Sequence, residues 1–588
     1  MDVNNKAVST FVGKASQPAT KETLTQKNIT KETMSTAEQS IAKVVEDQSN
    51  IDNAARLEAM QRSVRRGNLI PPTVSFESRG ITLVVGEGDA VSRFAASMLS
   101  ESCNHSVFLY MDDSSYSLPH DMQPYHASAV RISGFLGAFD VSVTHNMTEQ
   151  NLAKIAVGTS HFDLIVDLTK SGLHNAELPP LGYYAVGRGV VEEADAIEAV
   201  SDTVGTFDKP KYFRLDTDKC AHFSRGIEGC TRCIDACSAN ALESVKNKIT
   251  INPYLCQGLG SCSTACPTEA ISYALPEAEH TQQFVHQLLG HYSKAGGAFP
   301  IILFYAEADE AFVNQHLANL PSNLLPVRLE ELASVGIDTW FSAIASGASQ
   351  VLLLETDTLH PKTRNVLDGE LAIASGFLTN LGMPTQCVAL FNPNHLTSFS
   401  FLSQPATSGS APISGSKRDR LAAALDALSE GHDLTTRSEV PLGAPFGRIE
   451  IDTQDCTLCM GCVAVCPTDA LNALGDTPGI AFREQDCVQC GLCEKSCPES
   501  VITLSPGFNW DTESRQARNV IHQEAAAECI RCGKPYAPAS MVNMLIEKLR
   551  SHSHFQDDAI KRLSMCEDCR VRDIVSDLAE HPEKQLKL

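Results

Sequence analysis

Short apolar runs separated by amphipathic stretches recur in two regions of the chain. The first region, from Ile81 to about Phe207, contains the runs ITLVVG, SVFLYM and FDLIVDL. The second region, residues 298–400, contains PIILFYAEADE, LLPVRLEEL, ASQVLLLET and TQCVALFN. Apolar runs of this length that alternate with helical patterns are typical of buried parallel strands joined by crossover helices. The pattern therefore predicts two open α/β domains.

The remaining segments have different patterns. Residues 1–75 are rich in Ser, Thr, Lys, Glu and Gln and poor in aromatics, which predicts a disordered or partly helical segment. The stretch SQPATSGSAPISGS has the composition of a flexible linker, and the following KRDRLAAALDALSEG predicts a short amphipathic helix. We expect a multidomain α/β plus α+β fold. Its predicted parts are an N-terminal segment (1–75), an α/β domain (76–210), a Cys-rich module I (211–280), an α/β domain (281–402), a linker (403–416), a helical connector (417–445), a Cys-rich module II (446–508) and a helical metal-binding domain with four cysteines (509–588).

Composition and charge narrow the classes of function. At 588 residues and 43% hydrophobic content, the chain is long enough for several cores. Acidic residues outnumber basic ones by 71 to 47, giving a formal net charge of -24, which disfavours a nucleic-acid partner and suits docking onto a basic surface. The sequence contains neither a secretion signal nor an apolar run near the ~18 residues of a membrane helix. We therefore expect a cytoplasmic protein whose 21 cysteines are mostly metal ligands.

Module II contains two complete cysteine runs. Each run has the spacing C-x-x-C-x-x-C-x-x-x-C-P, which is typical of paired cubane clusters in which the fourth cysteine of one run reaches the other cluster. The predicted ligands of two [4Fe–4S] clusters are Cys456, Cys459, Cys462 and Cys497 for one, and Cys487, Cys490, Cys493 and Cys466 for the other. A zinc site would not explain eight cysteines and two Cys-Pro endings, at Pro467 and Pro498.

Module I repeats this plan with departures. Nine residues separate its first two cysteines, Ser238 stands in place of a proline, and Leu259 stands in a ligand position of the run CQGLGSCSTACP. Crossed ligation then gives one complete set, which we call set A, and one set of three, which we call set B. Set A is Cys220, Cys230, Cys233 and Cys266, and set B is Cys237, Cys256 and Cys262.

Three interpretations of set B remain open, because leucine cannot bind iron. A [3Fe–4S] cluster needs only three thiolates. A [4Fe–4S] cluster is compatible with set B if water, hydroxide or a nearby side chain holds the fourth iron. The third interpretation is an empty site. We rank the three-thiolate cluster first, because the glycines around Leu259 and the Cys-Pro ending are intact.

The sequence of module I also resembles a known family. The segments CAHFSRGIEGCTRCIDAC and CQGLGSCSTACPTEA resemble large bacterial 4Fe–4S ferredoxin-type proteins encoded beside formate dehydrogenase subunits. Region 298–400 loosely resembles the delta-subunit module of methyl-viologen-reducing hydrogenases, which connects hydrogenase or formate dehydrogenase to heterodisulfide reductase. That module carries cysteines for a cluster of its own, whereas only Cys387 lies in this region. The resemblance implies electron transfer with a dehydrogenase partner, formate dehydrogenase in particular.

Two further C-x-x-C pairs lie near the C-terminus, in ECIRCGKPYAP and MCEDCRVRD. They provide Cys529, Cys532, Cys566 and Cys569. Four thiolates in two such pairs are the usual ligands of a tetrahedral structural zinc ion. The gap of 33 residues between the pairs predicts a helical insert, MVNMLIEKLRS. Structural zinc is our preferred interpretation, and a further iron–sulfur cluster or a single iron is the alternative.

The segment VVGEGDAV is a weaker signal for a nucleotide site. It follows a predicted strand and contains Gly86 and Gly88, and Asp112 ends the next strand. However, Val91 occupies the third glycine position of the dinucleotide-binding pattern. A tight turn between strand and helix explains the glycines equally well, so we do not assign a nucleotide site here.

Three isolated residues complete the candidates. His222 follows a predicted ligand and either hydrogen-bonds a cluster sulfur or is simply partly exposed. Cys103 and Cys387 stand alone in the sequence and are expected to be small buried hydrophobic residues.

The cysteine pattern favours an electron-transfer function. Consecutive cluster-binding modules form a relay in which each cluster stores one electron. The sequence shows no pairing of acid and base typical of a catalytic site, so we predict no catalytic residues and expect a non-catalytic electron-transfer subunit of an oxidoreductase complex. The alternatives are an oxidoreductase with its own substrate, flavin or nucleotide site in an α/β domain, and a factor for iron–sulfur or enzyme maturation.

Overall fold

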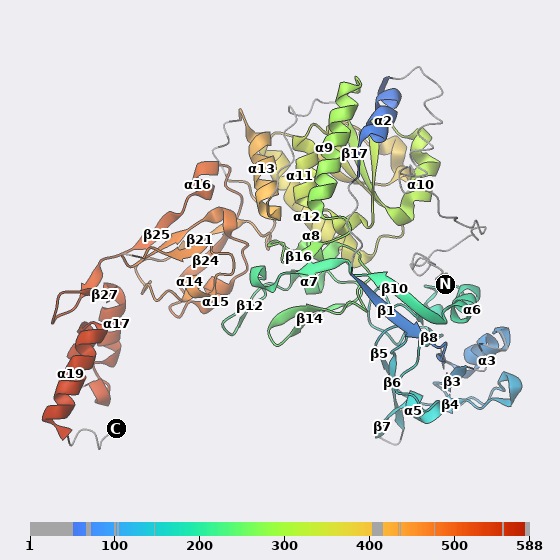
Figure 1. Cartoon of the computed structure of the whole chain (residues 1–588), viewed down its shortest axis with the longest axis horizontal. Coiled ribbons are helices and arrows are strands. Elements are labelled where there is room, and N and C mark those ends of the chain that lie inside the picture. Colours follow the sequence, from blue (N-terminus) through green and yellow to red (C-terminus); the bar gives the residue numbers. More distant parts are fainter. Residues whose placement is uncertain are drawn as a thin grey trace.

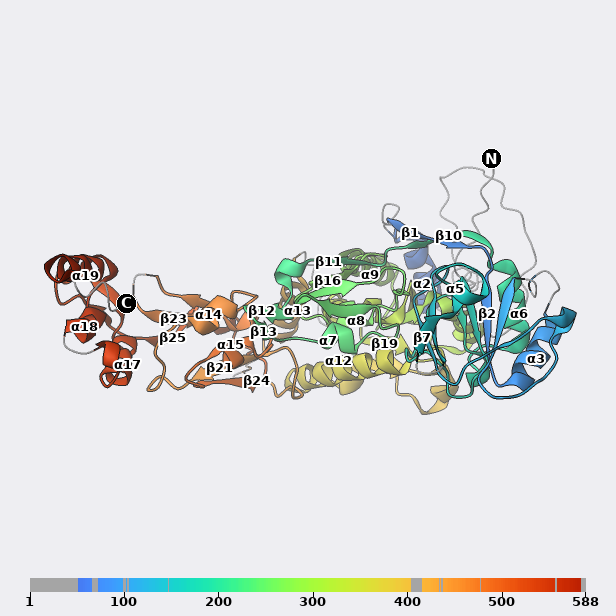
Figure 2. The ribbon, with the colours of Figure 1, turned by 90° about the horizontal axis from the view of Figure 1, so that it is seen from below.

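The computed structural model describes most of the chain after the first 50 residues. The described residues are 51–65, 72–98, 102, 105–145, 148–402, 415–432, 434, 437–475, 477–555 and 558–582. Most of the predicted N-terminal segment, residues 403–414 of the predicted linker, and Cys103 lie outside them. The units follow one another along the molecule, from the first α/β unit (blue) at one end to the C-terminal segment (red) at the other (Figures 1 and 2).

The first α/β unit is built on a five-stranded parallel sheet with the strand order β4-β3-β2-β8-β9. The strands are β2 (Thr82–Gly86), β3 (Ser106–Tyr110), β4 (Tyr125–His126), β8 (Leu164–Asp167) and β9 (Tyr183–Tyr184). The three apolar runs of this region form β2, β3 and β8, whose side chains are buried on both faces. Such burial explains why these runs are apolar throughout rather than alternating.

Each face of this sheet is covered by a separate layer. Helices α3 (Gly88–Ser97) and α6 (Glu193–Asp202) pack on one face. The other face packs against α5 (Leu152–Ala156) and an antiparallel sheet. That sheet consists of β5 (Val130–Ser133), β6 (Asp140–His145) and β7 (Thr148–Asn151). An antiparallel pair, β1 (Thr73–Ser78) with β10 (Gly205–Pro210), leads from this unit to module I.

The second α/β unit has a four-stranded parallel sheet with the order β18-β17-β19-β20. Its strands are β17 (Ile301–Ala306), β18 (Leu324–Leu329), β19 (Gln350–Leu354) and β20 (Val388–Phe391). Each strand lies within one of the four apolar runs. The surrounding helices are α9 (Ala278–Lys294), α10 (Glu310–His316), α11 (Ile337–Ala345) and α12 (Pro361–Asn380).

Two segments expected to stand apart pack against this second unit. Helix α2 (Ile51–Arg62) lies against α9, where Ala55 and Ala59 are buried and Arg56 donates to the Leu324 carbonyl at 3.1 Å. Helix α13 (Lys417–Ser429), which the sequence predicts as a connector, packs on α11 with three buried leucines. Its Arg420 pairs with Asp338 of α11 at 3.0 Å. Local sequence patterns do not reveal these contacts because the partners lie far away in sequence.

Modules I and II share one plan of two antiparallel strand pairs and two short helices. In module I, β11 (Phe213–Leu215) pairs with β16 (Ile271–Tyr273), and β14 (Leu242–Val245) pairs with β15 (Lys248–Ile251). In module II the corresponding pairs are β21 (Gly447–Ile451) with β24 (Ile502–Pro506), and β22 (Leu471–Ala473) with β23 (Gly479–Phe482). The helices are α7 (Arg232–Asp235) and α8 (Ser261–Ala265) in module I, and α14 (Gly461–Val465) and α15 (Leu492–Ser496) in module II.

The C-terminal segment extends module II before it forms its own small unit. After α16 (Thr512–Gln516), strand β25 (Asn519–Gln523) pairs with β23 and adds a third strand to that sheet. The unit itself contains β26 (Ala526–Glu528), β27 (Pro535–Pro538), α17 (Ala539–Leu549), α18 (Asp558–Lys561) and α19 (Glu567–Glu580). Helix α17 contains most of the predicted helical insert. None of the helices in the described part of the chain has the length and apolar character needed to cross a bilayer.

Candidate metal centres

The cysteine loops of module II have the same backbone shape in both runs. The second and fourth residues after the first cysteine have positive φ values, at Leu458 (50°) and Met460 (62°) in one run and at Gln489 (52°) and Gly491 (77°) in the other. Non-glycine residues rarely adopt this region of φ, so the repetition marks a backbone shape that the loop requires. The short helices α14 and α15 follow and begin just before the third cysteine of each run.

The run that contains Leu259 has this same backbone shape. Gly258 and Gly260 have φ values of 83° and 85°, at the positions of Leu458 and Met460 in module II. Leu259 therefore occupies the backbone position that Cys459 holds in module II. The loop thus has the form of a complete run, although a leucine stands at the position of one ligand.

A further backbone repeat follows the last cysteine of all four runs. The third residue after that cysteine has a positive φ in each case. These residues are Asn240 (49°), Glu269 (57°), Asp469 (54°) and Ser500 (56°). The repeat includes the run in which Ser238 stands in place of the proline. The backbone after Cys237 therefore has the same conformation as in the other three runs.

The thiols of module II lie together in crossed sets. Burial raises the pKa of Cys490 to about 11, with contributions from the charges of Cys487 and Cys466. Burial also raises the pKa of Cys462 to about 12, and Cys497 is among the neighbours that contribute. Cys497 of the second run also lines the same small cavity as Cys456, Cys459 and Cys462 of the first run, so the fourth cysteine of one run lies beside the other run. This is the arrangement that paired clusters need.

Set A of module I is brought together in the same way. Burial raises the pKa of Cys233 to about 12, with contributions from Cys266, Cys230 and Cys220. Cys266 comes from the second run, whereas the other three cysteines come from the first. The four thiols therefore form a complete donor set, and their binding of a cluster remains a prediction.

The three thiols of set B lie in a buried part of module I. Burial raises the pKa of Cys256 to about 11, and Cys237 contributes from the first run. Cys262 is buried beside both. The hydroxyl oxygens of Ser238 and Tyr273, in the same module, are buried and have no hydrogen-bond partner among the protein atoms. Three soft thiolate donors fit an iron–sulfur cluster, and unpaired buried hydroxyls in the same module are available as hydrogen-bond donors.

The loop at Leu259 is held between other parts of the protein. A Cβ atom on Gly258 would lie 2.6 Å from the ring of Tyr212, and one on Gly260 would meet the backbone of Ala333 and Ser334. Both glycines are thus required by close packing as well as by their positive φ. Set B therefore lies against the second α/β unit.

Buried or partly buried cations donate hydrogen bonds to the backbone carbonyls of predicted ligands. The pairs are Lys209 with Cys256 (2.6 Å), Lys362 with Cys237 (3.0 Å), Lys417 with Cys266 (3.3 Å) and Arg418 with Cys487 (3.0 Å). Burial lowers the pKa of Lys209 to about 8. Positive charges at these places favour the negatively charged reduced state of a nearby cluster. Sequence reasoning missed all four cations because no local pattern connects them to the cysteines.

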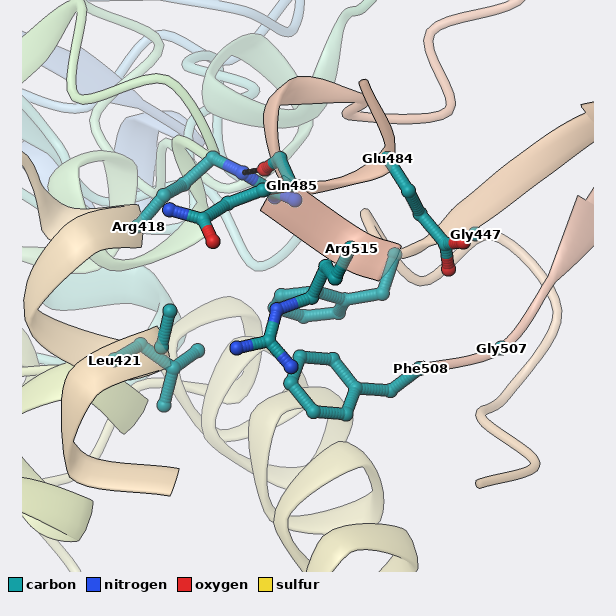
Figure 3. A pocket seen from close by; sticks show the side chains of 10 residues that line it. Arg418, Leu421, Gly447, Glu484, Gln485, Gly507, Phe508 and Arg515 are labelled. Atoms are coloured by element: carbon teal, nitrogen blue, oxygen red, sulfur yellow. Dashed lines mark hydrogen bonds between the residues drawn. The ribbon is translucent and has the colours of Figure 1, made fainter. Parts of the chain in front are cut away.

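Arg418 also joins module II to helix α13. Its guanidinium donates to the carbonyls of Gln485 and Pro445, both at 2.8 Å, and lies over the ring of Phe446. Figure 3 shows Arg418 and Gln485 on one side of a small cavity, with Arg515 and Phe508 on another. These contacts fix the loop of Cys487 to the second α/β unit.

His222 is a structural residue rather than a partner of a sulfur. Its side chain is 2% exposed, so the expectation of partial exposure was wrong. Nδ1 lies 2.9 Å from the carbonyl oxygen of Cys230, and Nε2 lies 2.7 Å from the Ser244 hydroxyl. Both ring nitrogens therefore have oxygen partners, and the histidine ties the loop before Cys230 to strand β14.

The four C-terminal cysteines converge on one point. Their sulfur atoms all lie within 4.8 Å of one another, and the Cys532 and Cys566 sulfurs are 3.7 Å apart. A Zn–S bond of about 2.3 Å in a tetrahedral site places its sulfurs about 3.8 Å apart, so the geometry fits a single ion. Among the described residues, no other group of three or more metal-binding side chains meets that spacing.

The environment of Cys529 also suits a bound cation. Although burial opposes ionisation, backbone N–H groups of Cys566, Arg531 and Cys532 donate to its sulfur and lower its pKa to about 6. These hydrogen bonds stabilise the thiolate form of Cys529, which is the form that binds metal, whereas hydrogen bonds among the thiols raise the pKa of Cys569 to about 12.

The turn at Gly86 and Gly88 is filled by the protein itself. The N–H of Gly88, at the start of α3, donates to both carboxylate oxygens of Asp112 at 3.2 and 3.3 Å. A carboxylate at a helix N-terminus takes the place that a phosphate would need.

Cys387, in the second α/β unit, is 2% exposed within the apolar core, as expected.

Comparison with known proteins identifies both modules. The family model for a 4Fe-4S dicluster domain matches residues 448–498, and the model for a 4Fe-4S binding domain matches residues 249–272. The second match includes Leu259. Ferredoxin-type domains are therefore present in both halves of the molecule, consistent with the shared backbone.

Two curated proteins illustrate the likeness. The ferredoxin-type protein NapF of Escherichia coli (strain K12) is 26% identical over 88 residues, which are 15% of this chain and 53% of that protein. The chain thus spans about half the length of this relative. The uncharacterized ferredoxin MJ0199 of Methanocaldococcus jannaschii is 37% identical over 59 residues, which are 9% of this chain and 94% of that protein. Through its iron–sulfur modules, the chain belongs to the ferredoxin family.

Proposed function

We propose that the chain is an electron-transfer protein that carries electrons through clusters in modules I and II to or from a redox partner. The crossed thiol sets are the observation that carries this proposal. Sets of four soft donors, largely screened from water, are suited to [4Fe–4S] clusters, which take up and release one electron at a time. We assign one cluster to set A and two to module II.

Set B takes a [3Fe–4S] cluster or an incompletely ligated [4Fe–4S] cluster in this proposal. The retained shape of the loop around Leu259 and the nearby unpaired hydroxyls support occupancy over an empty site. We prefer the three-iron form because three thiolates complete its ligation. The C-terminal site of four cysteines holds a structural zinc ion that folds the small terminal unit.

The partner in this proposal is a dehydrogenase, and formate dehydrogenase is the one that the sequence resemblance favours. The net charge of -24 suits docking onto a basic surface of that partner. In module II, Cys459 is exposed and Asp452 and Asp455 lie exposed in the same loop, so this end of the molecule is accessible to such a surface. The filled turn at Gly88 gives no support to the alternative of a nucleotide-dependent enzyme.

Anaerobic reduction of the full chain tests this function. The protein is mixed with formate, a catalytic amount of formate dehydrogenase, and then an artificial electron acceptor. We expect the iron–sulfur absorbance to bleach with formate and to return with the acceptor. A protein that dithionite reduces but formate dehydrogenase does not would overturn the choice of partner. A protein that dithionite cannot reduce would overturn the electron-transfer function itself.

Metal analysis tests the C-terminal site separately. We expect about one zinc per chain, and its loss in Cys532→Ser with the iron content unchanged. Iron in place of zinc, lost in the same variant, would contradict the zinc assignment.

A further inference from the structure

The enlarged loop of module I forms a hairpin. Strands β12 (Phe223–Ser224) and β13 (Ile227–Glu228) pair between the first two cysteines of set A. The two turn residues, Arg225 and Gly226, have φ values of 47° and 90°. Positive φ at both positions is the requirement of a tight two-residue hairpin turn. The nine-residue spacing that departs from the usual pattern is therefore an ordered element.

This hairpin packs against helix α15 of module II. The Lys495 ammonium donates to the carbonyl of Glu228 at 2.8 Å. A Cβ atom on Gly229 would lie 2.9 Å from Cγ of Leu492, a side chain with no exposed surface. Both views of the molecule show β12 beside α15 (Figures 1 and 2). The hairpin thus meets module II through close packing and a charge-assisted hydrogen bond.

A second contact spans the same junction in the opposite direction. Arg232, which lies between two cysteines of set A, donates to the carbonyl of Gly443 at 3.0 Å, just before strand β21. Lys495 of module II and Arg232 of module I thus each donate a hydrogen bond across the junction, and Arg232 reaches the end of the connector that leads into module II. Two contacts at separate places fix the relative orientation better than one.

The contacting residues adjoin predicted ligands on both sides. Glu228 and Gly229 directly precede Cys230, and Leu492 lies two residues after Cys490. These contacts bring the loops of Cys230 and Cys490 together, although 260 positions separate the two cysteines in the sequence.

We propose that hairpin 221–229 is the junction that joins the two modules into one electron relay. The order along the relay is set B, set A, the set of Cys466, Cys487, Cys490 and Cys493, and then the set of Cys456, Cys459, Cys462 and Cys497. This inference rests on the proposed electron-transfer function. With clusters bound, Cys230 and Cys490 would hold the two clusters that face each other at the junction, and a single electron would pass between them, reducing one cluster as the other is oxidised. No bond is made or broken, and no proton is required.

The experiment compares magnetic coupling between modules in the unmodified chain, two junction variants and a control. In the first variant, residues 221–229 are replaced by Thr-Leu, the pair that separates Cys456 from Cys459 in module II. The second variant, Leu492→Ala with Lys495→Ala, leaves every cysteine loop of module I intact. Lys248→Ala is the matched control, because this lysine is exposed on strand β15 of the same module.

The measured quantities are the iron content, the electron paramagnetic resonance of each reduced cluster, and the rate of electron equilibration between modules after partial photoreduction. We expect both junction variants to keep their iron, to lose the splitting caused by spin coupling across the junction, and to equilibrate at least about tenfold more slowly. The lysine control should match the unmodified protein in all three.

Different outcomes separate the possible failures. Unchanged coupling and rate in iron-replete junction variants, or no coupling across the junction in the unmodified protein, would overturn the inference. If the shortened hairpin loses the iron of set A, the double variant decides the question alone. If dithionite reduces the protein normally and the junction variants have unchanged coupling and rate, the junction role is wrong. The proposed electron-transfer function is then still supported.

Discussion

Modules I and II share a backbone plan but differ in what surrounds them. Module II has two complete cysteine runs, both Cys-Pro endings and an exposed ligand position at Cys459. Module I departs from that pattern in three places, and each departure contacts another part of the protein. The hairpin meets α15, the carbonyl of Ser238 accepts from Leu178 of the first α/β unit at 3.0 Å, and the Leu259 loop packs on the second unit. The three departures therefore lie where module I contacts the other parts of the molecule.

The largest expected effect comes from Cys266→Ser. If module I follows the crossed plan of module II, this change removes the cluster of set A, and about four irons per chain with it, although Cys266 lies in the run with Leu259. Iron analysis and electron paramagnetic resonance measure the loss. Cys237→Ser is the matched control and should affect only set B. Loss of the set B signal in Cys266→Ser would contradict crossed ligation in module I.

Leu259→Cys should make module I resemble module II more closely. The loop already has the backbone shape of a complete run, so a thiol there completes set B. We expect a gain of about one iron per chain and conversion of a three-iron signal into that of a [4Fe–4S] cluster. The reverse change in module II, Cys459→Leu, should produce the three-iron signal there. An unchanged spectrum in Leu259→Cys would show that a cysteine at this position does not bind the cluster, although the backbone shape is that of a complete run.

Lys209→Met should have a smaller effect, confined to set B. The change leaves the carbonyls of Tyr254 and Cys256 without their donor and removes a buried positive charge. We expect a cost of about 1–3 kcal/mol in the free energy of unfolding and a lower reduction potential for the set B cluster alone. Lys211→Met, at an exposed position nearby, is the control. Equal shifts in the potentials of all clusters would argue against a local effect of Lys209.

Ser238→Ala should give the smallest change in stability. The hydroxyl has no partner among the protein atoms, so its loss breaks no hydrogen bond within the protein. We expect less than about 1 kcal/mol of change in the free energy of unfolding, measured by thermal denaturation under anaerobic conditions. The potential of the set B cluster should fall if the hydroxyl donates to it. A fall in the potentials of the module II clusters would contradict that local role.

The sequence was most informative where structure depends on local patterns. Continuous apolar runs predicted β2, β3 and β8 of the first parallel sheet and all four strands of the second, because buried strands need apolar residues on both faces. The two-residue edge strands β4 and β9 lie outside these runs and were not predicted. The spacing of C-x-x-C pairs predicted the convergence of the four C-terminal thiols, although 33 residues separate the pairs. Cysteine spacing also indicated the crossed thiol sets, because in the duplicated motif the fourth cysteine of one run binds the cluster of the other run.

Long-range contacts could not be read in this way. The apolar stripe of α2 is narrow, since Ala55 and Ala59 are its small buried residues, so nothing in its sequence indicated packing on α9. The role of Lys209 was hidden because a lysine in a strand gives no sign that it will be buried against a cysteine loop. The hairpin after Cys220 was visible as an enlarged loop, but its contact with α15 depends on the arrangement of two modules.

We propose that one chain holds four redox clusters in a continuous relay. The most direct measurement is a redox titration of the anaerobically purified full chain, followed by electron paramagnetic resonance and combined with iron analysis. We expect about 15 irons per chain, a three-iron signal in the oxidised protein, and three spin-coupled [4Fe–4S] signals on reduction. Iron for only the two clusters of module II, with magnetically isolated signals, would contradict it.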